Sequence, residues 1–136
     1  MRSVRSLSTT RSEKIIKLVF CLRRLPHLSR AEFLDYWHNQ HGPLAVGFRE
    51  VMGMHKYIQL HTISTPFDAA LRDSRGGPEP FDGMVEAWWD SIEAIQRSLV
   101  DPRAQEAWTT LLEDEKRFID VKNSPIWIGE EHVMIA

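Results

Sequence analysis

The stretch FLDYWHNQHGPL, residues 33–44, decides the expected fold, because a helical pattern there meets the helix-breaking pair Gly42-Pro43. Phe33, Trp37 and His41 recur at every fourth position, so they lie on one face of a helix. Gly42-Pro43 follows directly, and proline both removes a backbone donor and clashes with the preceding turn. The sequence therefore predicts that the helix ends directly behind His41.

The segments on either side of this stretch extend the pattern. Ser29 and Glu32 have the S-x-x-E spacing of a capping box, which predicts that the helix begins at Arg30. Before it, residues 14–22, KIIKLVFCL, are apolar and β-branched, as in a buried strand. After the break, a helical pattern resumes until Gly53.

Residues 54–62, MHKYIQLHT, alternate with the period of a strand. This period places Tyr57, Gln59 and His61 on one face, together with His55. The segment that follows, residues 64–80, is rich in proline and glycine and predicts a long loop with one helical turn in it.

The last third of the chain repeats the strand and helix pattern. Residues 83–89, GMVEAWW, predict a strand, and Asp90 with Glu93 predicts the capping box of a short helix. Asp101-Pro102 is a strong helix start, and residues 126–135 predict the final strand. The longer helix is expected to carry an apolar stripe of Ala104, Trp108, Leu111, Leu112 and Phe118.

The element order β-α-β-β-α-β predicts an α+β, ferredoxin-like fold, with a four-stranded antiparallel sheet and helices on one face. The strands carry four large aromatic residues, which are too many for both faces of the sheet to be exposed to water. These residues are Phe20, Trp88, Trp89 and Trp127. A second copy of the same sheet would cover the face without helices, so we expect a homodimer.

Composition limits the protein's class and location. The 136 residues carry a net charge of −2, which does not favour nucleic-acid binding, and no apolar stretch approaches the ~20 residues of a membrane span. The single cysteine, Cys21, excludes an internal disulfide and indicates a reducing, cytoplasmic location. Residues 1–12 are rich in Arg and Ser, which predicts a disordered tail before a domain at residues 13–136; an organelle transit segment is the alternative.

Neither a metal nor a cofactor is expected from the motifs present. His38 and His41 have the spacing to share a metal, but H-E-x-x-H and carboxylate-rich motifs are absent. Gly76-Gly77 lacks the surroundings of a phosphate loop, and the chain has no nucleophile elbow.

Two roles remain open for His41. Its imidazole titrates near neutral pH, which suits proton transfer, but it would equally satisfy a free carbonyl at the helix break. Asp82 is expected as a turn residue, with a carboxylate partner for a histidine as the second interpretation. Trp37 and Trp88 are core or interface residues first and walls of an aromatic pocket second.

The chain resembles the EthD family of dimeric α+β barrel proteins over about residues 14–134. The resemblance rests on F-x-x-Y-W-x-x-x-H-G-P-L from Phe33, K-Y-I-Q-L-H from Lys56, F-D-G-M-V-E from Phe81 and E-D-E-K-R-F-I-D from Glu113. It implies a ferredoxin-like fold that pairs through its sheets and encloses a cavity between sheet and helices. Some members are implicated as cofactor-free dehydratases or isomerases, so the reaction must be argued from the site.

The resemblance implies a cofactor-independent lyase or isomerase, of the dehydratase type, acting on a small aromatic, lactone or polyketide-type metabolite. His41 would transfer a proton, Tyr57 and His61 would orient a carbonyl or hydroxyl, and Asp82 is a weaker catalytic candidate. The predicted substrate-binding residues are Trp37, Gln59 and Trp88. The alternative is a non-catalytic small-molecule-binding or accessory protein of a catabolic or oxygenase pathway. A cavity that exposes both His41 and Tyr57 favours the enzyme.

Overall fold

Four antiparallel strands form the centre of the computed structural model, which describes residues 15–136; the expected tail at residues 1–12 lies outside the described residues. The strand order is β2-β3-β1-β4, so β1 and β3 are central. This is the predicted ferredoxin-like arrangement, and the order of its elements is confirmed. The strands are β1 Ile16–Leu22, β2 Lys56–His61, β3 Gly83–Trp89 and β4 Ile126–Glu130.

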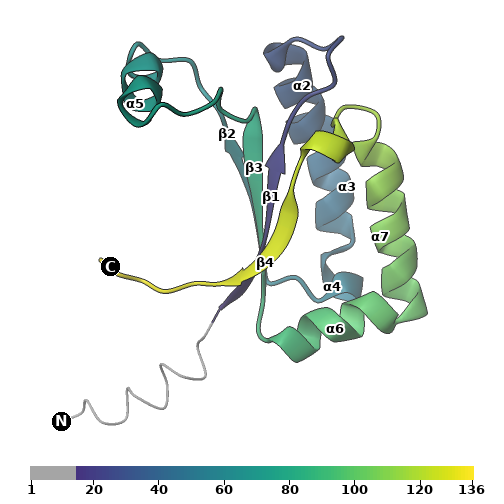
Figure 1. Ribbon diagram of the computed structural model, residues 1–136. Helices are drawn as coiled ribbons and strands as arrows, with labels where there is room; N and C mark the ends of the chain where they lie inside the picture. The colour runs from purple at the N-terminus through teal and green to yellow at the C-terminus, as the bar shows by residue number, and fades with distance from the viewer. Residues whose placement is uncertain (1–14) are drawn as a thin grey trace, which may run out of the picture.

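The main helices lie on one side of this sheet, while α5 and the C-terminal segment extend on the other (Figure 1). Among the described residues, no helix is both long and apolar enough to span a membrane. The helical elements are α2 Arg30–Tyr36, the π-helical turn η1 Trp37–His41, α3 Gly42–Gly47, α4 Arg49–Met52, α5 Phe67–Arg75, α6 Ile92–Val100, α7 Pro102–Glu115 and the 3-10 turn η2 Val121–Asn123.

Three helix starts test the predicted caps. The Ser29 capping box is present, and the Asp101 side chain caps α7 by accepting from the Arg103 N–H. The cap predicted at Asp90 is wrong, because the Ser91 hydroxyl accepts from the Ala94 N–H one position later. A hydroxyl at that position satisfies a free helix donor, so α6 begins at Ile92.

The helix end predicted at Gly42-Pro43 is also wrong, since the chain continues directly into α3. The turn Trp37–His41 is π-helical, and the Gly42 N–H donates to the Trp37 carbonyl, five residues back. A turn with one extra residue moves the backbone away from the ring of Pro43, which an α-helical turn would hold in a clash. The proline therefore widens the helix instead of ending it.

Three further expectations need correction. The segment read as a loop contains the nine-residue helix α5, and β4 ends at Glu130 instead of residue 135. Leu112 is 42% exposed, whereas Ala107 on the next face of α7 is buried. The apolar stripe of α7 thus lies slightly around the helix from its expected position.

The two sheet faces differ in their cover. Of the four large strand aromatics, Phe20 and Trp89 are buried under the helices. Trp127 is paired with Val19 on the open face and is 49% exposed. Trp88 lies on that same face, where the ammonium groups of Lys17 and Lys56 are each 4.4 Å from its ring.

Candidate active site

Trp37 and Trp89 are the two largest fully buried side chains among the described residues, and Trp37 comes from the π-helical turn. Its ring lies against Gly83 of β3, where a Cβ atom would overlap the indole. The glycine of the FDGMVE segment is therefore needed for a close approach of helix to sheet. On its other side, the Trp37 ring stacks on His61 with 4.8 Å between ring centroids.

His41 is the last residue of the π-helical turn, and it is buried to 5% exposure. Its Nδ1 lies 2.8 Å from Oδ2 of Asp114, whose Oδ1 accepts a 2.6 Å hydrogen bond from the Tyr36 hydroxyl. A carboxylate only accepts, so Nδ1 carries the proton. Burial lowers the pKa of His41, although Asp114 opposes the shift, and the neutral ring then has an unprotonated Nε2.

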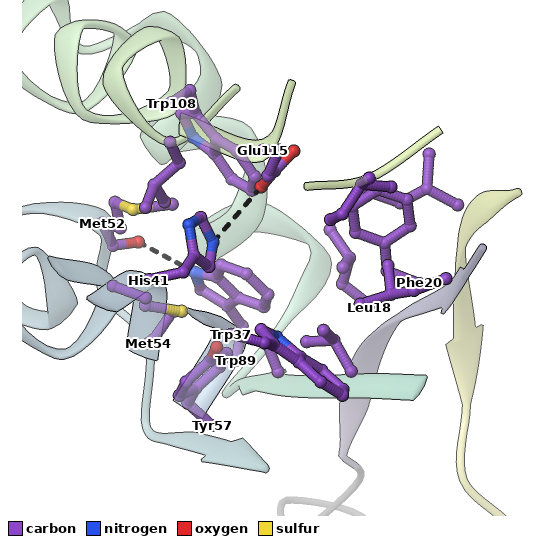
Figure 2. A pocket seen from close by; sticks show the side chains of 17 residues that line it. Leu18, Phe20, Trp37, His41, Met52, Met54, Tyr57, Trp89, Trp108 and Glu115 are labelled. Carbon is purple, nitrogen blue, oxygen red and sulfur yellow. Dashed lines mark hydrogen bonds and ion pairs between the residues drawn. The ribbon is translucent and has the colours of Figure 1, made fainter. Parts of the chain in front are cut away.

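Glu115, at the end of α7, lies beside that nitrogen on the helical side of the cavity: its Oε2 is 3.7 Å from Nε2 of His41 (Figure 2). Burial raises the pKa of Glu115 to about 7, and the neighbouring charge of Asp114 raises it further in the same direction. No Lys or Arg of the described residues lies within ion-pair distance of Glu115. The carboxyl group therefore holds its proton up to neutral pH.

A cavity of about 60 Å³ separates the helices from the sheet at this point. Its walls are mainly apolar, and three ionisable groups reach it: His41, Tyr57 and Glu115. A water needs roughly 10–15 Å³ on this measure, so the cavity has room for a few waters. Its apolar walls include Leu18, Phe20, Met52, Trp89, Trp108 and Leu111 (Figure 2).

The predicted polar row on β2 is confirmed, and it faces the helices. Gln59 Nε2 donates to the Trp37 carbonyl at 3.0 Å and to the Tyr57 hydroxyl at 2.9 Å. Its Oε1 accepts from Nε2 of His61 at 2.8 Å. A Cβ at Gly42 would lie 3.0 Å from Gln59 Nε2, so the glycine of the HGPL segment makes room for this amide.

Tyr57 is held by that network as a hydrogen-bond donor. Burial raises the pKa of Tyr57, so the hydroxyl keeps its proton at neutral pH. The oxygen already accepts from Gln59, which leaves the Tyr57 proton for an acceptor on a bound molecule.

A second, open groove of about 630 Å³ lies outside the cavity, beside the edge strand β2. His61 and His38 line this groove, and the pKa of His61 is lowered by burial and by the nearby His38. Tyr57 lines both the groove and the cavity, so its side chain forms part of the wall between them. His61 thus belongs to the outer compartment and His41 to the inner one.

Two predicted site residues lie elsewhere. Asp82 is buried at the start of β3, where it accepts from Arg24 Nη1 at 2.5 Å, from Arg30 Nε at 3.0 Å and from the Arg24 N–H at 2.8 Å. Its partners are arginines, with no histidine among them, and these contacts hold its pKa low despite its burial. Trp88 points to the open face of the sheet, away from His41.

Asp114 and Glu115 were not among the residues predicted for the site. Both belong to the EDEKRFID segment that contributes to the family resemblance, which was the only signal available. The structure brings the end of α7 over the π-helical turn, which joins residues 73 and 74 positions apart. Among residues 15–136, no group of three or more His, Cys, Asp or Glu side chains is arranged to hold a metal ion.

Fold and site together define a ferredoxin-like α+β protein with a buried histidine between two carboxyl groups. A sequence profile of the EthD domain matches residues 25–122, and the chain belongs to the EthD family. It is 27% identical over 120 residues to the conidial pigment biosynthesis dehydratase EthD of Metarhizium robertsii, covering 86% of this chain and 82% of that protein.

Solved structures share the fold at lower identity. An EthD family protein of Bacillus halodurans matches with a TM-score of 0.57 and 22% identity, over 87% of this chain and 99% of that one. A hydroxynitrile lyase of Passiflora edulis matches with a TM-score of 0.54 and 14% identity, over 91% and 99%. These likenesses confirm the predicted fold, and the EthD profile confirms the predicted family.

Proposed function

We propose that the protein is a cofactor-independent lyase of the dehydratase type, acting on a small aromatic, lactone or polyketide-type metabolite. The observation that carries the proposal is the unprotonated Nε2 of His41 inside an apolar cavity, with Nδ1 fixed by Asp114. A neutral imidazole with one nitrogen held by a carboxylate is a general base of fixed orientation. The dehydratase name of the Metarhizium relative agrees with this chemistry.

The cavity suits the abstraction of a proton next to a carbonyl group. Tyr57 donates to the carbonyl oxygen, on which negative charge develops as His41 takes the neighbouring hydrogen. Apolar surroundings strengthen such a donor, because water does not compete for the oxygen. The same proton transfer without a leaving group would be an isomerisation.

The substrate enters from the outer groove. The cavity of about 60 Å³ is smaller than a ring-bearing metabolite, whereas the groove of about 630 Å³ accepts one. Movement of the Tyr57 side chain joins the two spaces, because this residue lines both. In this arrangement Trp37, Gln59 and His61 contact the outer part of the substrate.

The test uses a β-hydroxytetralone, a bicyclic β-hydroxy ketone that becomes a fluorescent naphthol after loss of water. The variant His41→Gln should lower turnover by about a thousand-fold, as expected for loss of a general base. His55→Gln is the matched control, since His55 is exposed and lies outside the cavity. Unchanged turnover in His41→Gln, or no turnover of the probe by the wild type, contradicts the proposal.

We also propose that two copies pair through the open face of the sheet. Leu60 is 57% exposed and Trp127 is 49% exposed there, on a face that the helices leave uncovered. Exposed apolar surface of this kind is typical of a self-complementary interface.

Sedimentation equilibrium tests the pairing. Leu60→Lys and Trp127→Lys should each shift the protein from dimer to monomer, because a lysine ammonium resists burial between two sheets. Leu112→Lys on the exposed side of α7 is the control and should remain dimeric. A monomeric wild type would overturn the pairing but would leave the cavity chemistry to be judged by its own test.

A further inference from the structure

Glu115 stands in the cavity beside the proposed base, and the reaction described so far gives it no role. The base explains only half of a dehydration, since hydroxide leaves poorly unless an acid protonates it. We propose that Glu115 is the acid that protonates the departing hydroxyl, that His41 and Glu115 act on the same face of a β-hydroxy carbonyl substrate, and that the elimination is therefore syn. This inference rests on the proposed lyase function.

The first support is geometric. Nε2 of His41 and Oε2 of Glu115 are 3.7 Å apart, and both reach the cavity from the helical side. Two groups this close, on one wall, contact a hydrogen and a hydroxyl on the same face of a ligand. An anti elimination would require acid and base on opposite faces.

The second support is that the two groups favour opposite protonation states. His41 is kept neutral by its burial, while Glu115 is partly buried, with 18% of its side chain exposed, and keeps its proton because no cation lies beside it. Two neighbouring groups with pKa values displaced in these directions form a matched base and acid.

The charged and titratable groups around Glu115 are few. His41 faces it from η1, Tyr57 from β2, and Asp114 adjoins it on its own helix. Arg117 pairs with Asp114 at 3.6 Å and is 72% exposed. From the sheet, β1 and β3 contribute only apolar side chains to the cavity, including Leu18, Phe20, Val85, Ala87 and Trp89.

The step balances without an oxidant or cofactor. Nε2 of His41 takes the α-hydrogen as a proton, and the C–H electron pair forms the enolate that the Tyr57 hydroxyl stabilises. That pair then forms the C=C bond while the C–O bond breaks, and the departing oxygen takes the Glu115 proton and leaves as water. The imidazolium finally returns a proton to the Glu115 carboxylate, which restores both groups.

The decisive variant is Glu115→Gln, which keeps the shape of the side chain but has no proton to transfer. With the β-hydroxytetralone, turnover should fall by about a hundred-fold or more. With the β-chloro analogue, whose chloride leaves without a proton, the same variant should keep turnover within about threefold of wild type, whereas His41→Gln should lose both activities. Glu113→Gln is the matched control, because Glu113 is exposed on the same helix.

Stereochemistry gives a second readout that folding defects do not imitate. A probe with deuterium at the α-carbon, cis to the hydroxyl, should give naphthol without the label, as read by mass spectrometry at short times. Retained deuterium, or an equal loss with both probes in Glu115→Gln, overturns the acid role while leaving the base role intact. Infrared spectroscopy should also show one protonated carboxyl near pH 6 that is missing from Glu115→Gln; absence of that band in the wild type contradicts the proposal even without turnover.

Discussion

Asp82 and Glu115 are both carboxyl groups shielded from water in the same small domain, yet the pKa of Asp82 is lowered and the pKa of Glu115 is raised. Asp82 has two guanidinium groups and a backbone N–H around it, so its pKa is lowered in spite of its burial. Glu115 has no cation beside it, so its burial, together with the charge of Asp114, raises its pKa to about 7. Burial alone does not decide charge; the partners supplied by neighbouring elements do.

Asp82 and Glu115 therefore have different roles, the first structural and the second chemical. Asp82 joins the start of β3 to the segment around Arg24 and to Arg30 of α2, and its charge is fully used in those contacts. Glu115 stabilises nothing comparable, and its proton remains available to a molecule in the cavity. Glu115, as a proton donor, is therefore expected to lower the stability of the fold, whereas the ion pairs of Asp82 raise it.

The largest effect is expected from Asp82→Ala. Removing this buried acceptor should destabilise the fold by about 3–4 kcal/mol, because two arginines and a backbone N–H lose their partner. Urea denaturation measures the loss, and Asp82→Asn, which retains an oxygen for the Arg24 N–H, should lose less. A change below about 1 kcal/mol in Asp82→Ala would contradict a structural role.

Glu115→Gln should instead stabilise the fold above neutral pH. The pKa is raised from the ordinary 4.5 to about 7, so the folded state keeps a proton that the unfolded chain releases between these values. Stability is thus lost as pH rises through this window, and the cost above it is about 3 kcal/mol at most, from 1.36 kcal/mol per pKa unit.

Denaturation curves at two pH values test this linkage. The variant should be more stable than wild type at pH 8.5 and close to wild type at pH 3.5, which lies below the ordinary pKa of 4.5, so that Glu115 is protonated in both the folded and the unfolded state. A destabilised variant at both pH values would mean that Glu115 acts as a structural group like Asp82.

The dependence of kcat/KM on pH should show a smaller effect than these changes in stability. With the β-hydroxytetralone, kcat/KM should fall about tenfold per pH unit above the Glu115 pKa of about 7, and should also fall on the acid side, where His41 gains a proton at a pH lower than its ordinary pKa of 6.5. With the β-chloro probe, which needs no acid, the alkaline fall should be absent from both wild type and Glu115→Gln. An alkaline limb that Asp82→Asn removes would contradict the assignment.

The smallest effect belongs to Glu113→Gln. Glu113 pairs with Lys116 at 3.2 Å on the surface of the molecule, and both side chains are more than half exposed. Such pairs are worth less than about 0.5 kcal/mol in most cases, so stability and turnover should both stay near wild type. A loss above about 1 kcal/mol would show that the end of α7 is sensitive to any change of charge, which would weaken the Glu115 tests.

Local signals explain how much of the fold was predictable. Ser29 with Glu32 set the start of α2, and the period-two pattern placed Tyr57, Gln59 and His61 on one face, because caps and strand alternation act over a few residues. The Ser91 cap and the length of α5 were missed, since several residues near each boundary satisfy the same local rule.

Only the half of the candidate site that contains His41 and Tyr57 was predictable from the sequence. His41 and Tyr57 stood out by residue type and position, and both line the cavity. Their carboxyl partners come from the far end of α7, and no local rule states which helix end packs over which turn. The same limit applies to Asp82, whose arginine partners lie 58 and 52 positions away.

The π-helical turn at Trp37–His41 acts as a spacer of one residue in an otherwise regular helix. Deleting Asn39 would return the turn to ordinary α-helical winding, and the residues on either side would keep nearly the same directions. The ring of Pro43 would then clash with the preceding turn, which would disturb the position of His41 beside Asp114 and Glu115 while Trp37 stayed on Gly83. Loss or gain of a single codon in this turn would thus separate a folded scaffold from a chemically competent one, and related chains can be sorted by that spacing alone.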